Sequence, residues 1–190
     1  MARRKVVLDS GCGTGNVTEE LLKRGHVVYA VDTSVKALDI LRKRCAGHGE
    51  KLHVYNVDAV KLPFEDGTFD GASSMFVAHF VDDFQKYLRE HYLVLKPGGV
   101  FALTGRTSGD NMKRVVESYE DSLEKRGLMP ELGPQMKTVR RNIICGVSKM
   151  VLHGYTSGEA ETMLKEAGFR SVQVFPNPYF GQCYSLTARK

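Results

Sequence analysis

The sequence predicts an α/β fold built on a mostly parallel sheet, and two observations support this. Short apolar segments alternate along the chain with segments whose apolar residues recur at helical spacing. Three of the apolar segments end in an aspartate, at Asp9, Asp32 and Asp58. Strands and helices that alternate in this way form parallel sheets with right-handed crossovers, and ligands bind such sheets at the carboxyl ends of the strands. We therefore expect the three carboxylates to lie at one edge of the sheet.

The first unit is a strand, a glycine turn and a helix. Val6 to Leu8 form an unbroken apolar run, as in strands buried on both faces, and the helix begins at Asn16. Glycines permit positive φ and let a ligand approach the backbone, and the free N–H groups at the helix start suit a phosphate or a carboxylate. The G-x-G-x-G spacing departs from the dinucleotide pattern G-x-G-x-x-G, which disfavours NAD. A tight turn without a ligand is the alternative. The glycines are Gly11, Gly13 and Gly15.

The other elements follow in order along the chain. Helices are expected after caps at Ser34, at Asp82, at Asp110 or Asn111, and at Thr156, which forms a capping box with Glu159. Pro97-Gly98-Gly99 is expected to end the helix that Asp82 begins, and Met129 to Pro134 is expected to be a link. Further strands are expected at residues 26–31, 52–57, 69–75, 100–104, 171–175 and 182–188.

Length, charge and cysteine content narrow the class of protein. A chain of 190 residues fits one domain with a substantial core, and a net charge of +5 lies within the ordinary range for a domain of this size. The four cysteines are scattered, which predicts reduced thiols in a cytoplasmic protein and neither a disulfide framework nor a metal site. No apolar stretch suits a signal peptide or a membrane span, so no membrane partner is expected.

The three aspartates predict a nucleoside ligand. One carboxylate can accept both hydroxyl groups of a ribose, which suits Asp32, and Asp58 or its neighbouring backbone can read an adenine edge beside Val57 and Ala59. Asp9 either fixes the glycine loop or faces a positively charged group. No Walker lysine follows the glycines, so the ligand need not carry phosphate. We expect a nucleoside at one end and a zwitterionic tail over the glycine turn.

Five ordered motifs resemble those of class I S-adenosylmethionine-dependent methyltransferases. Each motif alone is unspecific, but the five in this order are specific. The resemblance covers residues 5–104, and a closing segment at 167–169 matches more loosely. The motifs are Val7 to Gly15, Val31-Asp32, Asp58-Ala59 with Leu62-Pro63-Phe64, Phe69-Asp70, and Leu95 to Gly99.

This resemblance implies a Rossmann-like three-layer sandwich with a mostly parallel seven-stranded sheet whose last strand is antiparallel. It implies a single methyltransferase domain over residues 1–190, with 105–155 as a helical substrate roof. The methionine moiety of S-adenosylmethionine would lie over the glycine turn, the ribose on Asp32, and adenine near Asp58 and Ala59. Met75 and Phe76 match the position that flanks the sulfonium. The implied cofactor-binding residues are Asp9, Gly11, Cys12, Gly13, Gly15, Asn16, Asp32, Thr33, Asp58, Ala59, Met75 and Phe76.

Two residues are candidates for the transfer step. Methyl transfer is an in-line displacement, so the protein mainly aligns the nucleophile and removes a proton where needed. His79 is a candidate general base, although packing beside the cofactor is the commoner role. Arg106 is a candidate for orienting an anionic substrate, with a solvated loop arginine as the alternative. His153 and Tyr155 could face the same cleft.

The expected methyl acceptor is a small molecule, modified at O, N or C. One alternative is an RNA (tRNA) methyltransferase that uses Lys137 to Lys149 as a phosphate footprint. Another is a non-catalytic S-adenosylmethionine-binding or partner-activating subunit. Members of this family commonly carry helices before the first strand that cover the cofactor, whereas this chain begins almost at the strand. The cofactor site is therefore expected to be open, or covered by a partner chain or a dimer, unless the chain itself is a shortened form.

Overall fold

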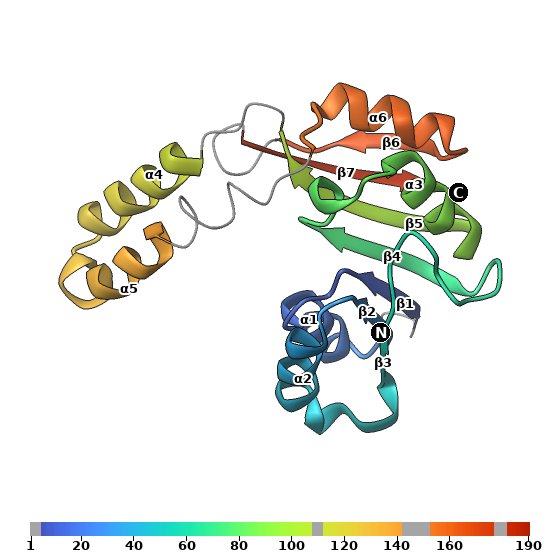
Figure 1. Cartoon of the computed structure of the whole chain (residues 1–190), viewed down its shortest axis with the longest axis horizontal. Helices are drawn as coiled ribbons and strands as arrows, with labels where there is room; N and C mark the ends of the chain where they lie inside the picture. Colours follow the sequence, from blue (N-terminus) through green and yellow to red (C-terminus); the bar gives the residue numbers. More distant parts are fainter. Residues whose placement is uncertain (1–4, 108–111, 142–152, 177–181) are drawn as a thin grey trace.

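A seven-stranded sheet forms the centre of the molecule (Figure 1). The computed structural model describes residues 5–107, 112–141, 153–176 and 182–190. The strand order is β3-β2-β1-β4-β5-β7-β6, and β7 runs antiparallel to both of its neighbours while the other pairs are parallel. The expected sheet is confirmed. The strands are β1 (Val6–Ser10), β2 (Val27–Asp32), β3 (Leu52–Asn56), β4 (Phe69–Met75), β5 (Leu95–Arg106), β6 (Arg170–Val174) and β7 (Cys183–Arg189).

Helices cover both faces of this sheet and complete the three layers. Val28 and Ala30 pack with residues of α1 and α2, whereas Tyr29 and Val31 belong to the main core that includes α3 and α6. Successive residues of a strand point to opposite faces, so α1 and α2 lie on one side of the sheet, and α3 and α6 lie on the other. The helices are α1 (Asn16–Lys23), α2 (Val35–Arg44), α3 (Phe84–Val94), α4 (Met112–Lys125), α5 (Met129–Arg141) and α6 (Ser157–Glu166), with 3₁₀ turns η1 (Ala46–Lys51) and η2 (Ala78–Phe80).

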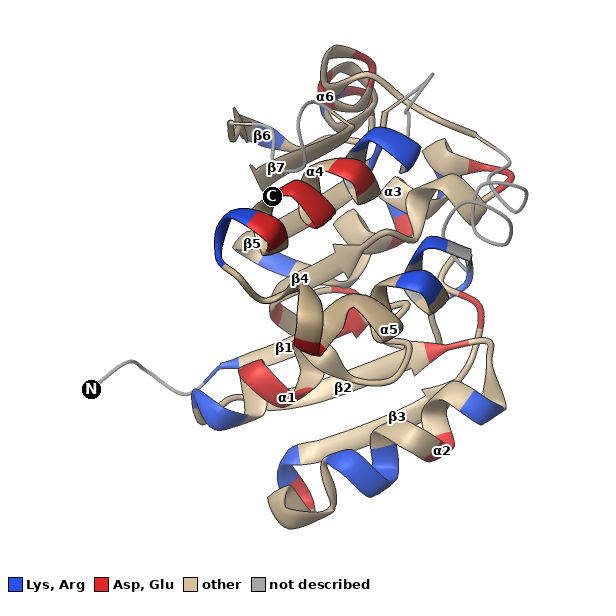
Figure 2. Ribbon diagram, turned by 90° about the vertical axis from the view of Figure 1, so that its left-hand side faces the viewer, with Lys and Arg blue, Asp and Glu red and all other residues tan. Residues whose placement is uncertain are grey.

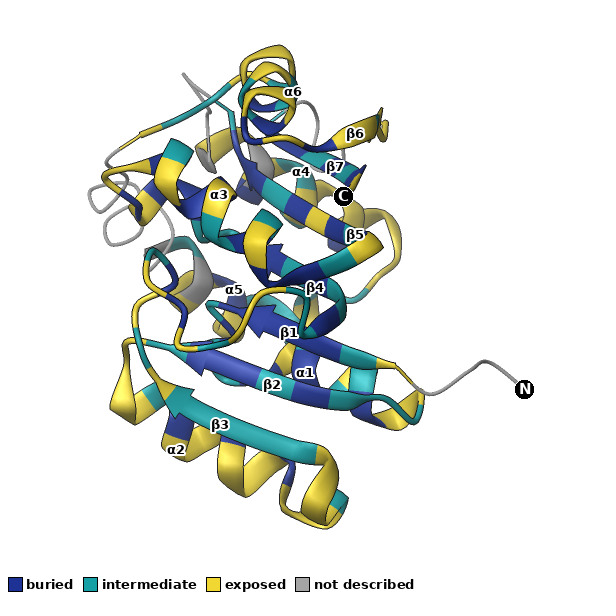
Figure 3. Cartoon of the chain, turned by 90° about the vertical axis from the view of Figure 1, so that its right-hand side faces the viewer, coloured by how far each residue is buried: buried dark blue, intermediate teal, exposed yellow. Residues whose placement is uncertain are grey.

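The buried core follows the central strands and positions their carboxyl ends. Figure 3 shows buried segments along β1 and β2, and the side chains of Leu8, Phe69 and Phe101 are fully buried. β1 pairs with β2 on one side and with β4 on the other, so the strand order reverses at β1. Ligands bind open α/β sheets at such a reversal, outside the carboxyl ends of the strands. The end of β1 is therefore where a site is expected from the topology alone.

The start and end of α3 differ from the prediction. The N-cap is Asp83 and not Asp82, because the Asp83 carboxylate accepts a hydrogen bond from the N–H of Lys86 at 2.8 Å. The helix ends at Val94, and Leu95 already pairs with Phe69 in the sheet. Pro97-Gly98-Gly99 therefore lies within β5 and does not end the helix. By contrast, the capping box of Thr156 and Glu159 is confirmed.

The predicted link from Met129 to Pro134 is wrong, because these residues form the first half of α5. Pro130 lies in the first turn, where a helix needs no intrahelical N–H donor, so only Pro134 removes a helical hydrogen bond. Met136 is buried against Val116 and Leu123 of α4, and this packing supports the helix. Figures 1 and 2 show α4 and α5 side by side, standing apart from the sheet on the side of the strands' carboxyl ends.

Candidate functional site

The glycine turn after β1 is held against β2 by its backbone. The N–H groups of Gly11 and Cys12 donate to the carbonyl oxygen of Val31, at 2.8 and 3.0 Å. All three glycines have positive φ, at +68° for Gly11, +52° for Gly13 and +90° for Gly15. A Cβ atom at position 11 would overlap the side chain of Val77, whereas one at position 13 would meet nothing within 4 Å. Position 11 therefore has no room for a side chain, whereas the backbone at Gly13 faces open space.

Asp9 supports this turn from beneath. Its side chain is buried, and its carboxylate accepts hydrogen bonds from the hydroxyls of Thr18 at 2.6 Å and Ser73 at 2.9 Å. Burial raises the pKa of Asp9, and these two hydrogen bonds lower it by less. Asp9 therefore joins β1, α1 and β4. Of its two expected roles, the structure agrees with fixing the loop.

Asp32 connects the glycine turn to the end of β2. One carboxylate oxygen accepts from the N–H of Gly13 at 2.8 Å, and the other accepts from the N–H of Ser34 at 2.8 Å. A carboxylate oxygen can accept a second hydrogen bond, so both oxygens retain capacity for donors in the space above them. A vicinal pair of hydroxyl groups presents two such donors.

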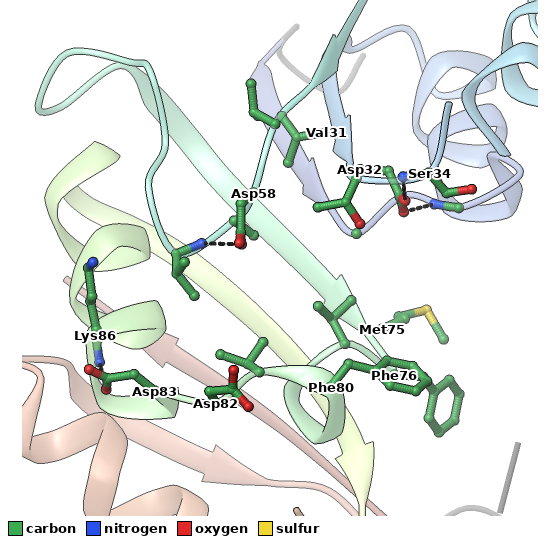
Figure 4. Close-up of a pocket in the computed structure, with 18 residues that line it drawn as sticks. Val31, Asp32, Ser34, Asp58, Met75, Phe76, Phe80, Asp82, Asp83 and Lys86 are labelled. Carbon is green, nitrogen blue, oxygen red and sulfur yellow. Dashed lines mark hydrogen bonds between the residues drawn. The ribbon is translucent and has the colours of Figure 1, made fainter. Parts of the chain in front are cut away.

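A cavity of about 730 Å³ opens beside Asp32 (Figure 4). Its lining comes from the glycine turn and from the segments that follow β2, β3 and β4. Asp58 lies on the segment after β3, where its carboxylate accepts from the N–H of Val60 at 3.0 Å. The cavity brings together eight of the predicted cofactor residues, namely Gly11, Gly13, Asp32, Thr33, Asp58, Ala59, Met75 and Phe76.

The other predicted cofactor residues do not line this cavity. Asp9 and Cys12 are buried, and burial raises the pKa of the Cys12 thiol. A Cβ atom at Gly15 would lie 2.9 Å from Leu41 Cγ, so this glycine permits close packing of the turn on α2. The side chain of Asn16 is exposed and accepts a hydrogen bond from Arg44. These four residues shape the turn without facing the space.

Sequence reasoning missed one wall of the cavity, which η2 and the start of α3 provide. Asp82, Asp83 and Lys86 line it together with Phe80, whose side chain is exposed. Phe76, at the end of β4, has a φ of +58°, and its N–H donates to the carbonyl of Thr104 at 2.8 Å. The rule that ligands lie beyond the carboxyl ends of the strands would have drawn attention to the Asp82-Asp83 pair, because it follows β4.

His79 and Arg106 lie near this edge of the sheet but outside the lining of the cavity. Both are buried, His79 in η2 and Arg106 at the end of β5. The N–H of His153 donates to the carbonyl of His79 at 3.3 Å, and that of Tyr155 donates to the carbonyl of Arg106 at 3.4 Å. The buried position of Arg106 contradicts the solvated-loop alternative. The four residues are thus brought together by backbone contacts at the carboxyl edge.

The lining of the cavity carries an excess of negative charge. Asp32, Asp58, Asp82 and Asp83 contribute carboxylates, and Lys86 contributes one ammonium group. A concave site with one sign of charge raises the local concentration of ligands of the opposite sign. The cavity therefore favours a ligand that carries positive charge, such as a sulfonium or an ammonium group.

The basic stretch proposed as an RNA footprint is only partly within the described residues. Arg140 of α5 pairs with Glu120 at 2.7 Å and lies 3.9 Å from Glu117, both on α4. Lys137 is exposed, whereas Lys149 lies outside the described residues. An arginine that is paired with two glutamates is less available to neutralise phosphate.

Two classes of feature are absent from the ranges that the structure describes. No three His, Cys, Asp or Glu side chains there are grouped so that they could hold a metal ion. Nor does any helix in those ranges have the length and apolar character that a bilayer crossing requires.

The chain belongs to a family of methyltransferase domains, whose family model matches residues 8–103. This match contains the glycine turn, the strand ends that carry Asp32 and Asp58, and the wall that ends in α3. The expected family is thereby confirmed.

Individual relatives extend the comparison. The malonyl-[acyl-carrier protein] O-methyltransferase of Salmonella typhimurium is 31% identical over 127 residues, which cover 66% of this chain and 49% of the relative. The ubiquinone/menaquinone biosynthesis C-methyltransferase of Vibrio campbellii is 28% identical over 177 residues, which cover 89% of this chain and 66% of the relative. The match thus spans between about half and two thirds of the length of these curated relatives.

A solved structure is similar along almost the whole chain. It is the 1,6-didemethyltoxoflavin-N1-methyltransferase of Burkholderia thailandensis, with bound 1,6-didemethyltoxoflavin and S-adenosylhomocysteine. The TM-score is 0.65 and the identity 25%, over 99% of this chain and 72% of that one.

Proposed function

We propose that this chain is an S-adenosylmethionine-dependent methyltransferase that acts on a small molecule. One observation carries the proposal: Asp32 and the open backbone of Gly13 face one cavity and are hydrogen-bonded to each other at 2.8 Å. This arrangement offers a ribose acceptor and a backbone cradle side by side, and the acidic lining suits a cationic cofactor. Membership of the methyltransferase-domain family supports the same activity.

The residues of the cavity fit this cofactor in an extended arrangement. We assign the methionine tail to the backbone of Gly11 and Gly13, the ribose hydroxyls to Asp32, and adenine to Asp58 and Ala59. Thr33 lies next to the ribose, and Met75 and Phe76 lie beside the sulfonium. In this proposal Asp9, Cys12, Gly15 and Asn16 position the turn without contacting the cofactor. The bound cofactor supplies an electrophilic methyl group that an in-line nucleophile can take.

The acceptor atom in the proposal is an oxygen, a nitrogen or a carbon. The names of the relatives specify an O-, a C- and an N-methyltransferase, so the family supports all three. We propose His79 as a general base and Arg106 as a group that orients the acceptor, because both lie at the carboxyl edge of the sheet beside the cavity wall. The segment 105–155, which contains α4 and α5, is proposed as the substrate roof of a single domain over residues 1–190.

The proposed location is the cytoplasm. Cys12 and Cys45 are buried free thiols, which is the usual state of cysteines in a reducing compartment.

Isothermal titration calorimetry on the full chain tests the cofactor assignment. S-adenosylmethionine and S-adenosylhomocysteine are expected to bind with one site per chain, and NAD is expected not to bind, because the turn lacks the dinucleotide spacing. Absence of binding by both S-adenosyl compounds would contradict the proposal. Transfer of a labelled methyl group to extracted small molecules would then test the activity itself.

A further inference from the structure

Tyr87 is a wholly buried residue of α3, and its hydroxyl group reaches the two central strands β1 and β4. This hydroxyl donates to Oγ of Ser74 at 2.5 Å and lies 3.5 Å from Oγ of Ser10. Both serines are completely buried, and they pair with each other in the sheet. Within the described ranges neither serine hydroxyl has another hydrogen-bond partner. The three hydroxyl groups thus form one polar cluster inside the apolar core.

The two serines of this cluster adjoin two different sides of the cavity. Ser10 precedes Gly11 of the glycine turn, and Ser74 precedes Met75 at the end of β4. Gly11 and Met75 both line the cavity, whereas Tyr87 is not among its lining residues. A hydroxyl that holds both serines therefore fixes the spacing of these two sides without contact with a ligand.

The end of β1 is tied to β4 on both faces of the sheet. On the face of α1, Asp9 makes hydrogen bonds to Thr18 and Ser73. Successive residues of a strand point to opposite faces, so Ser10 points toward α3, where the hydroxyl of Tyr87 lies. Without the tie on the α3 face, the glycine turn should shift more easily relative to β4.

We propose that Tyr87 is a positioning residue of the cofactor site, which acts through the two serines. Its hydroxyl sets the spacing between the glycine turn and the segment of Met75 and Phe76. This inference rests on the proposed function, in which the methionine tail lies on the turn and the sulfonium lies beside that segment. A ligand that spans both sides binds with an apparent affinity that falls with the fraction of molecules already in the competent arrangement. Tyr87 raises that fraction.

Removal of the Tyr87 hydroxyl should therefore weaken cofactor binding. Tyr87→Phe keeps the ring and its packing against Phe84 and His91, so the change is confined to the hydroxyl cluster. The affinity for S-adenosylhomocysteine is expected to fall by about threefold to tenfold, which is the effect of one lost hydrogen bond. Ser74→Ala should cause the same loss. The double variant should bind no more weakly than either single variant, because both changes remove the same contact.

Asp70→Ala is the matched control. Asp70 also ties β4 to β1, but at the opposite ends of these strands, where its carboxylate accepts from the N–H of Val6 at 2.8 Å and from Lys96 at 2.9 Å. This variant should lose stability, as Tyr87→Phe does, and keep the wild-type affinity. A loss of affinity confined to the hydroxyl cluster separates positioning from a general loss of stability.

Amide hydrogen exchange of the ligand-free chain gives a second readout, which does not require the cofactor. The N–H groups of Gly11 and Cys12 donate to the carbonyl oxygen of Val31 and report on opening of the turn. These two amides should exchange at least about threefold faster in Tyr87→Phe than in Asp70→Ala, because the turn has lost its tie to β4.

Calorimetric titration of the full chain with S-adenosylhomocysteine, after a thermal melt has shown that each variant is folded, separates the two proposals. Wild-type affinity in Tyr87→Phe, or an equal loss of affinity in Asp70→Ala, would overturn the inference and leave the proposed function standing. Equal exchange rates at Gly11 and Cys12 in the two variants would also overturn it. Failure of the wild-type chain to bind would overturn the proposed function and the inference with it.

Discussion

The carboxylate of Asp32 accepts a hydrogen bond from the backbone N–H of Gly13 across 2.8 Å, and this contact joins the end of β2 to the turn after β1. Asp32, which we propose binds the ribose, thus also fixes the backbone of Gly13, which we propose binds the methionine tail. The two halves of the proposed cofactor site therefore cannot be varied independently.

Asp32→Ala should therefore weaken both the fold and the binding of ligand. The affinity for S-adenosylhomocysteine is expected to fall more than about tenfold, because two ribose hydroxyls lose their acceptor. The free energy of unfolding should fall by about 1–3 kcal/mol, because the N–H groups of Gly13 and Ser34 lose theirs. Calorimetry and urea denaturation measure the two effects. Asp66→Ala is the control, and an equal loss of affinity in that variant would refute the assignment.

Gly11→Ala and Gly13→Ala should differ, although both positions have positive φ. At Gly13 an added methyl group meets open space, so the cost is the backbone strain of about 1–2 kcal/mol. At Gly11 the methyl group also overlaps Val77, so the loss of stability should be larger. The double variant Gly11→Ala with Val77→Ala should recover part of the difference. Urea denaturation of the wild type and the three variants checks this, and no recovery would argue against steric overlap as the cause.

His91 is expected to make the fold sensitive to acid. Burial lowers the pKa of His91 from its ordinary value of 6.5 to about 4, because the side chain lies wholly inside the core against the rings of Tyr87 and Phe101. Between these two pH values the unfolded chain binds a proton that the folded chain does not. Stability should therefore fall as the pH falls from 6.5 to about 4, by about 3 kcal/mol in total.

The variant His91→Phe should flatten this part of the stability profile. The test compares the slope of unfolding free energy against pH in wild type and variant, because a larger ring also changes the absolute stability. His48→Gln changes a half-buried residue of the mostly exposed turn η1, so this variant serves as the control and should retain the wild-type slope. A wild-type slope in His91→Phe would show that another group is responsible.

Two buried tyrosines should respond in opposite ways to removal of the hydroxyl group. The hydroxyl of Tyr184 has no hydrogen-bond partner among the described residues, so Tyr184→Phe should raise the free energy of unfolding by up to about 1 kcal/mol. The hydroxyl of Tyr87 donates to Ser74 at 2.5 Å and lies 3.5 Å from that of Ser10, so Tyr87→Phe should lower it by about 1–2 kcal/mol. Urea denaturation of the two variants measures both changes in unfolding free energy. A loss of stability in both variants would indicate that the Tyr184 hydroxyl has a hydrogen-bond partner.

Much of the fold could be predicted because local pattern and topology agree. Apolar runs ending in Asp9, Asp32 and Asp58 marked three strands and their carboxyl ends, and the structure places two of these carboxylates in the cavity. Asp9 shows the limit of this reasoning. In the sequence Asp9 follows an apolar run just as Asp32 and Asp58 do, yet its side chain points into the protein. Its direction is set by the alternation of side chains along the strand and by its hydrogen-bond partners Thr18 and Ser73.

The parts that sequence reasoning missed depend on contacts between distant segments. Pro130 and Pro134 indicate a loop by local propensity, but packing on α4 produces a helix there. The sequence predicted Asp82 as the N-cap of this helix. The structure shows that Asp83 is the N-cap and that Asp82 lines the cavity. A one-residue difference in the cap changes which carboxylate a ligand can reach.

A crystal structure of the full chain with S-adenosylhomocysteine decides whether the cavity beside Asp32 holds the cofactor. We expect the nucleoside to occupy the cavity beside the glycine turn, with both ribose hydroxyls within hydrogen-bonding distance of the Asp32 carboxylate and the amino-acid tail over Gly11 and Gly13. A ligand bound elsewhere, or a ribose held by residues other than Asp32, would contradict it.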